Sequence, residues 1–235
     1  MARLGVGADT LTPPQCGALD ADGCIVLRRV FDAAQCAQLL EAFERTYVPS
    51  HLWPQPRGHD TRHAMLNGEI AVRRLCLAPQ ILACVHHLLR RRFFLSDVQG
   101  RDPVLGGGYQ RLHRDWVAPQ GPAPMIIVLA FLDDFGPANG ATRVLPGTHL
   151  LAGGADVYRD AGLQHPDQVV VEGAGGDVLV MNGYLAHSAT QNTSGAHRRN
   201  LQVNFRGHEM AAPAADRVES GALPAEVLYL FGEDA

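Results

Sequence analysis

Three residues of metal-binding types stand at two distant places in the chain. His113 and Asp115 lie in the stretch Gln110-Arg-Leu-His-Arg-Asp-Trp116, and His187 follows far downstream. On a β-strand, side chains two residues apart point to the same face, so an imidazole and a carboxylate would stand side by side. Two histidines and one carboxylate are the ligands of non-haem iron sites that keep three adjacent positions open. The pattern predicts that His113, Asp115 and His187 bind iron and form the catalytic centre.

An arginine follows the distal histidine on the next predicted strand. Arg198 comes eleven residues after His187. A guanidinium can form two parallel charge-assisted hydrogen bonds with a carboxylate, which a lysine cannot reproduce. Its neighbour Arg199 would point to the opposite face of the strand, so only one of the two can enter a barrel. An ordinary surface arginine is the alternative interpretation.

Other interpretations of these histidines are open at this point. A lone His-x-Asp is a weak signal, because short motifs occur by chance. His113 could be a hydrogen-bonded strand residue, with Asp115 starting a turn. His59 and His63 would share one face of a helix, as in zinc sites, but nearby prolines disfavour a helix there.

Composition excludes several classes of function. The net charge of −4 does not fit a nucleic-acid-binding protein, whose charge would be basic. All twenty basic residues are arginine, which excludes Schiff-base, pyridoxal-phosphate and Walker-loop chemistry, each of which needs lysine. Five cysteines without a Cys-x-x-Cys pair indicate reduced thiols in a cytoplasmic protein. There is no signal-peptide pattern, and the longest apolar run, 125–132, is too short to span a membrane. We expect neither a nucleic-acid nor a membrane partner, and the oligomeric state is left open.

The chain divides into a helical region, a β-rich region and a tail. We expect helices over 12–20, from Asp32 onward, and over 79–92, with a short strand over 24–30. Turn signals then separate short strands over 93–101, 109–113, 125–132, 142–145, 168–171, 177–181, 186–191 and 200–206. This pattern predicts a mainly β fold with flanking helices, whose core is a barrel-like jelly roll of the cupin type. We expect one domain over 1–235, with a helical N-terminal region over 1–92, a core over 93–208 and a tail over 209–235 that contains a helix over 224–231.

Residues 48–66 interrupt the helical region. Prolines and Gly58 disfavour regular structure, while aromatic and cationic side chains are frequent. Loops of this length inside a domain are often functional. We predict a lid over the site, in which Arg62 or His63 reaches the substrate and Trp53 also contacts it. Trp116 would line the mouth beside the metal.

Several of these stretches together resemble the phytanoyl-CoA dioxygenase-like family of Fe(II)/2-oxoglutarate oxygenases. They are 11–28, Leu112-His-Arg-Asp-Trp116, Asn139-Gly-Ala-Thr-Arg-Val-Leu-Pro-Gly-Thr-His149, 176–180, His187 and Arg198. The resemblance implies a double-stranded β-helix core, iron at His113, Asp115 and His187, and Arg198 on the far carboxylate of 2-oxoglutarate.

The chain also departs from that family near the co-substrate. Relatives often have Ser or Thr two residues after the distal histidine, where this chain has Ala189. Arg101 stands near a position where relatives often carry Lys, and Leu129 near one where they carry Trp. We expect Arg101, Leu129, Gln110 and Gln99 beside the co-substrate.

The expected function is that of an Fe(II)/2-oxoglutarate-dependent dioxygenase that uses O2 to hydroxylate a small organic molecule. Secondary metabolism is one setting for such an enzyme, and desaturation, ring closure and epimerisation are open as other outcomes. A non-catalytic β-barrel that binds a small ligand is the alternative from another class. A zinc-dependent hydrolase with the same ligands is a weaker alternative.

Overall fold

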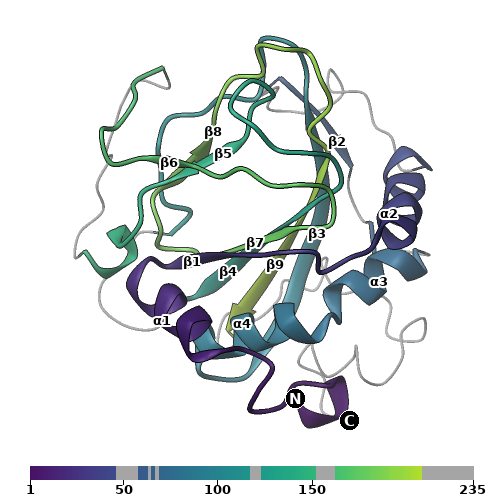
Figure 1. Ribbon diagram of the computed structural model, residues 1–235, viewed down its shortest axis with the longest axis vertical. Helices are drawn as coiled ribbons and strands as arrows, with labels where there is room; N and C mark the ends of the chain where they lie inside the picture. Colours follow the sequence, from purple (N-terminus) through teal and green to yellow (C-terminus); the bar gives the residue numbers. More distant parts are fainter. Residues whose placement is uncertain (46–57, 63–64, 67–68, 117–122, 152–161, 208–235) are drawn as a thin grey trace.

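Two antiparallel β-sheets face each other in the computed structural model (Figure 1). The structure describes residues 1–45, 58–62, 65–66, 69–116, 123–151 and 162–207. The large sheet has the strand order β1-β7-β4-β9-β3-β2, and the small sheet has the order β6-β5-β8. In that order, the large sheet consists of Cys24–Leu27, Val178–Asn182, Met125–Phe131, Asn200–Gly207, Phe93–Pro103 and His59–Arg62, and the small sheet of Val169–Val170, Thr142–Val144 and His187–Ala189. The arrangement is a jelly roll, which confirms the predicted fold class.

Four helices lie along the outer face of the large sheet (Figure 1). They are α1 (Pro13–Ala21), α2 (Ala33–Arg45), α3 (Ile70–Cys76) and α4 (Pro79–Leu89), and two short 3₁₀ helices span Ala2–Leu4 and Thr148–Leu150. Thr12 and Gln15 form a capping box at the start of α1. Asp32 and Gln35 exchange backbone-to-side-chain hydrogen bonds of 2.9 and 2.8 Å before α2. Both helices therefore start where their capping residues satisfy free backbone N–H groups.

Alternating residues of the large sheet face two different surroundings. Ile126, Val128 and Val203 pack against the helices on the outer face. Ile127 and Leu129, which alternate with Ile126 and Val128 along β4, face the small sheet, as does Met181 of β7. Period-two alternation in strands buried on both faces produces these two apolar clusters.

Several local predictions differ from the structure, among them the helix over 79–92, which ends at Leu89, and the strand over 24–30, which ends at Leu27. Residues 109–112 are not a strand; only His113 forms an isolated bridge with His187. The N–H of Gln110 bonds to Ala189 and that of His113 bonds to His187, so the pairing slips by one residue and the ladder is interrupted. Residues 59–62, predicted as irregular loop, form β2, and α3 was not predicted.

The predicted helical region also contributes to the core, because β1 and β2 are the two edge strands of the large sheet. The tail 209–235, with the helix predicted over 224–231, lies outside the described residues. All five cysteines are free thiols. Within the described stretches of the chain, the helices are too short or too polar to cross a bilayer.

Candidate active site

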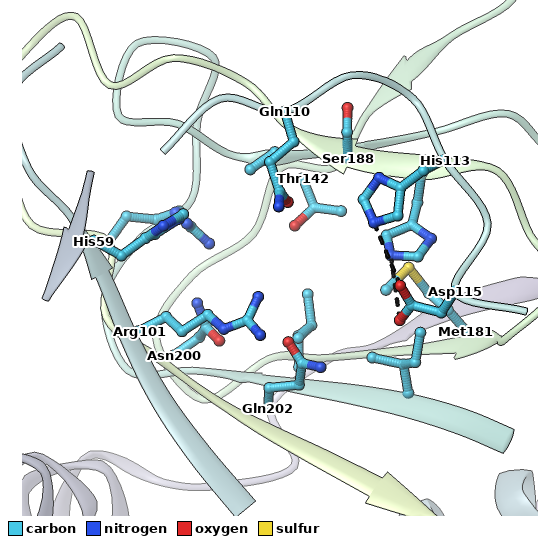
Figure 2. Close-up of a pocket in the computed structure, with 15 residues that line it drawn as sticks. His59, Arg101, Gln110, His113, Asp115, Thr142, Met181, Ser188, Asn200 and Gln202 are labelled. Carbon is cyan, nitrogen blue, oxygen red and sulfur yellow. Dashed lines mark ion pairs between the residues drawn. The ribbon is translucent and has the colours of Figure 1, made fainter. Parts of the chain in front are cut away.

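The two predicted histidines and the carboxylate meet between the sheets (Figure 2). His113 and His187 exchange backbone hydrogen bonds of 3.0 and 2.9 Å, which place their side chains next to each other. Asp115 lies in the bend that follows, with one oxygen 3.3 Å from Nε2 of His113 and the other 4.0 Å from Nε2 of His187. One possible ligand atom from each residue lies within 4.8 Å of the others, a spacing that suits a single metal ion.

Backbone carbonyls set the tautomer of both imidazoles. Nδ1 of His113 lies 2.9 Å from the carbonyl oxygen of Arg111, and Nδ1 of His187 lies 2.9 Å from that of Leu185. A carbonyl oxygen only accepts, so each Nδ1 carries the hydrogen and each Nε2 keeps its lone pair. Such outer hydrogen bonds orient metal-binding histidines, and here they direct both lone pairs toward Asp115.

The surroundings also favour the charge states that metal ligands need. Burial lowers the pKa of His187, which favours the neutral imidazole, although Asp115 opposes the shift. Burial raises the pKa of Asp115, but the adjacent side chains of His113, His187 and Arg101 outweigh it and lower that pKa to about 2. A neutral imidazole and an ionised carboxylate are competent ligands at neutral pH.

A pocket extends from this group toward β3 and β9 (Figure 2). It holds about 560 Å³ of empty space, some of which is open to solvent. Besides the three candidate ligands, its lining consists of His59, Arg101, Gln110, Ile127, Leu129, Thr142, Met181, Ser188, Ala189, Arg198, Asn200 and Gln202. Most of these side chains are polar, which suits a polar ligand held beside a metal.

Arg198 is a buried cation in this pocket. It is 3% exposed, and its Nε has no hydrogen-bond partner among the described residues. The guanidinium lies 4.9 Å from the centre of the Phe135 ring, and burial lowers its pKa to about 10. Its backbone N–H donates to Asp102 at 3.0 Å. A buried guanidinium with an unused donor is a ready site for a carboxylate.

Arg199 turns away from the pocket, as the sequence predicted. Its guanidinium donates to Asp133 at 2.8 Å and to Glu44 of α2 at 2.8 Å. Only one of the two neighbouring arginines therefore lines the pocket.

Three of the four residues predicted beside the co-substrate line the pocket: Arg101, Gln110 and Leu129. Gln99 does not; its Oε1 accepts a hydrogen bond of 3.3 Å from Arg101. His59, Asn200 and Gln202 also line the pocket, and none was predicted in this role. Asn200 and Gln202 share a face of β9, so alternation along the predicted strand 200–206 is the signal that could have found them.

The structure places Arg62, a predicted substrate contact, outside the pocket lining. Its Nε donates to the carbonyl oxygen of Phe43 at 2.8 Å, and its guanidinium lies 4.1 Å above the Phe43 ring. His59 points into the pocket, and Arg62, three residues further along β2, points to the other face of the sheet. Trp116 is 41% exposed and does not belong to the pocket lining. Trp53 and His63 lie outside the described residues.

Comparison with known proteins identifies relatives of this chain. A family model described as phytanoyl-CoA dioxygenase (PhyH) matches residues 19–200. The dioxygenase FUM3 of Gibberella moniliformis is 34% identical over 116 residues, which cover 44% of this chain and 37% of FUM3. Matches to the curated relatives thus span well under half of the length of those proteins.

Solved structures share the fold. HygX from Streptomyces hygroscopicus, with nickel and 2-oxoglutarate bound, has a TM-score of 0.72 at 19% identity, covering 92% of this chain and 94% of HygX. SnoN, described as a non-heme alpha ketoglutarate dependent epimerase from nogalamycin biosynthesis, has a TM-score of 0.66 at 19% identity, covering 95% of this chain and 90% of SnoN. Because the family model covers most of the sequence, the chain belongs to the phytanoyl-CoA dioxygenase family.

Proposed function

We propose that this protein is an Fe(II)/2-oxoglutarate-dependent oxygenase that oxidises a small organic molecule. One observation carries the proposal: a two-histidine, one-carboxylate group shares a pocket with a buried arginine that has an unused donor. Family membership supports it, as do the solved structures of HygX with nickel and 2-oxoglutarate and with hygromycin B.

The residues of the pocket fit this co-substrate. Nε2 of His113, Nε2 of His187 and the Asp115 carboxylate would hold Fe(II), since their lone pairs and charges are already directed to one point. Arg198 would bind the far carboxylate of 2-oxoglutarate through its buried guanidinium. Arg101 adds a second positive charge at this end of the pocket, and Gln110 adds an amide.

Iron, 2-oxoglutarate and O2 supply the oxidising chemistry when bound, with succinate and CO2 as co-products. The contribution of the chain is to orient these groups and to limit the access of water. Ile127, Leu129 and Met181 provide an apolar wall beside Asp115 for that purpose. Trp53, His63 and Trp116 stay predicted substrate contacts.

O2 uptake tests the proposal directly. The purified protein should consume O2 and release succinate when both Fe(II) and 2-oxoglutarate are present, and not when either is omitted. Addition of small-molecule libraries should identify compounds that increase this turnover, and mass spectrometry of the product distinguishes the gain of an oxygen atom from desaturation or epimerisation. Absence of 2-oxoglutarate-dependent O2 uptake would contradict the proposal, and hydrolysis with Zn(II) in place of Fe(II) would favour a hydrolase.

Replacement of either histidine tests the metal assignment. We expect His113→Ala and His187→Ala to abolish Fe(II) binding in anaerobic titrations, because two remaining ligands cannot form the facial site. His86→Ala, at an exposed position of α4, is the matched control and should bind iron like the unaltered protein. Full iron affinity in either pocket variant would show that the metal binds elsewhere.

A further inference from the structure

A β-bulge interrupts β3 beside the candidate active site. Pairing with β9 shifts between Leu95 and Asp97, so Ser96 is the extra residue. Leu95 and Val98 both pack on the helix side of the sheet, although they are three residues apart. Regular alternation would not allow this, so the bulge turns Asp97 to the inner face. Bulges often redirect a side chain next to an active site.

Asp97 lies in the same row of the sheet as two pocket residues. Cross-strand pairing joins Asp97 to Asn204, Asn204 to Ile127 and Ile127 to Met181. Ile127 and Met181 line the pocket, and Figure 2 shows Met181 next to Asp115. Asp97 is two strands from Ile127, roughly 10 Å away. Asp97 itself lies just outside the pocket lining, one row beyond Gln202. A small molecule that extends past Gln202 and Ile127 toward β3 would contact Asp97 and still reach the metal position.

The carboxylate of Asp97 accepts hydrogen bonds from neutral groups. Its partners are Ser96 Oγ at 3.2 Å, Gln99 Nε2 at 3.0 Å and Asn204 Nδ2 at 3.0 Å. Within the described chain, no cation forms an ion pair with Asp97. This holds also for Arg206, which is the next inner-face residue along β9. Asp97 is only partly buried, so its charge is accessible and is not compensated by a neighbouring cation.

Charged side chains occupy separate rows of the inner face, with Asp97 between the row of Arg101 and the row of Arg206. Arg101 and Asn200 share a row at the end of the pocket where Arg198 lies, and Gln99 and Gln202 form the row between them and Asp97. A dianionic co-substrate is attracted to the arginine end. The carboxylate end would repel it and attract a cation.

We propose that Asp97, supported by Asn204 and Gln99, binds a positively charged amino group of the substrate. This rests on the proposed function and names the substrate class of the same site. Ile127, Leu129 and Met181 would contact the carbon skeleton between the amino group and the metal.

Binding of matched amines and amides tests the assignment. The probes are cyclohexylamine and glucosamine, each compared with its N-acetyl derivative, and cyclohexanecarboxylate as an anion. Dissociation constants come from ligand-observed NMR titrations of the full chain. Since a hydrogen bond to a charged group is lost on acetylation, each amine should bind about tenfold more tightly than its amide. Equal binding, or tighter binding of the amide or the anion, overturns the proposal.

Substitution of Asp97 tests whether this residue causes the preference for amines over amides. Asp97→Asn keeps an acceptor oxygen for Asn204 and removes the charge, so the preference for amines should disappear. Asp167→Asn, whose parent side chain is 85% exposed, is the matched control and should keep it. A preference that survives in Asp97→Asn also overturns the proposal. The amine-to-amide comparison on the unaltered protein decides the charge preference even if this variant does not fold.

These titrations require no turnover, so the two proposals fail separately. If amines bind in an Asp97-dependent way but no 2-oxoglutarate-dependent O2 uptake occurs, the amine-binding site is supported and the oxygenase function is rejected. If O2 uptake occurs but amines are not preferred, the oxygenase function is supported and the amine-binding site is rejected.

Discussion

The protonation of the candidate ligands is set by atoms outside the ligand group. Carbonyl oxygens of Arg111 and Leu185 hold the hydrogens of the two imidazoles, and burial keeps His187 neutral. Asp115 stays ionised because the adjacent side chains of His113, His187 and Arg101 outweigh the effect of its burial. No side chain would have to change its tautomer before it binds a metal ion, so the site is preorganised for one.

The role of Arg198 can be separated from that of its neighbour by substitution. Loss of charge-assisted hydrogen bonds costs about 1.5–3 kcal/mol, so Arg198→Ala should weaken 2-oxoglutarate binding about tenfold or more. Arg199→Ala removes the adjacent guanidinium, which bonds to Asp133 and Glu44, and should leave that affinity near the original value. Calorimetric titration of the anaerobic iron-loaded protein measures both. Unchanged affinity in Arg198→Ala would move the role to Arg101.

Residue types and spacing were enough to predict the group formed by His113, Asp115, His187 and Arg198. Few combinations of side chains can bind both a metal ion and a carboxylate. Asp97 could not be predicted, since it faces inward only through a bulge. His59 was considered as a zinc ligand with His63 on a helix that the nearby prolines disfavoured, and was predicted in a loop; the structure places it in a strand. Orientation that depends on a partner strand leaves no local signal.

The segment that carries His113 is irregular and is held by Arg143 of β5. This buried guanidinium donates to Ser188 Oγ at 2.7 Å, to the carbonyl of Gln110 at 3.1 Å, to the carbonyl of Leu163 at 2.8 Å and to Gln168 at 3.0 Å. Ser188 is adjacent to His187, and Gln110 precedes His113. Arg143 therefore joins the two segments that supply the histidines, and we regard it as a positioning residue.

Removal of these hydrogen bonds should lower both the stability of the protein and its affinity for Fe(II). Arg143→Met leaves several buried acceptors without a donor, and each unsatisfied group costs about 1–3 kcal/mol. The free energy of unfolding should fall by about 3 kcal/mol or more, as measured by urea denaturation, and the folded protein should bind Fe(II) more weakly. Arg143→Lys should restore some of both, because lysine reaches fewer of the acceptors.

Arg45→Met is the control for that experiment. Arg45 is 57% exposed and pairs with Glu69 at the surface, where solvent screening makes such pairs contribute little to stability. An Arg143→Met protein that loses stability but keeps full iron affinity would show that Arg143 stabilises the fold without positioning the ligands.

Helices and strands differed in how well the sequence predicted them. Caps and apolar spacing located α1, α2 and α4, and the turn signals located most strands of the core. β2 is His-Asp-Thr-Arg, which has no apolar alternation, and it is a strand because β3 pairs with it. Tertiary pairing outweighed local propensity there, and the prolines that indicated a loop lie before it.

Two carboxylates connect the helical layer to the barrel. Burial raises the pKa of Asp177, but hydrogen bonds from Arg29, Arg28 and Ala174 outweigh it, so the pKa is lowered. The same balance applies to Asp133, whose pKa is lowered by Arg199 against the effect of burial. Arg199 also bonds to Glu44 of α2, and Arg28 lies between β1 and α2. Both carboxylates therefore stabilise the whole molecule in their ionised form.

Acid should weaken this connection. A carboxyl group whose pKa is lower in the folded state stabilises the protein above its unfolded pKa of about 4, and loses that contribution as the pH falls through the folded value. The free energy of unfolding should thus decrease below about pH 4. Asp177→Asn and Asp133→Asn should each lower stability at pH 7 and make this decrease shallower. Urea denaturation between pH 7 and pH 3 measures it, with Asp167→Asn as an exposed control that keeps the full decrease.

The large sheet separates the residues that hold the molecule together from those that contact ligands. Its outer face packs against four helices in the larger apolar cluster, while its inner face carries the polar rows between β2 and β4. Substitutions of polar residues on the inner face therefore leave the larger apolar cluster without new cavities. Such a fold is evolvable: a lineage can exchange inward side chains of β3 and β9, and with them its substrates, while the framework that supports the metal is inherited unchanged.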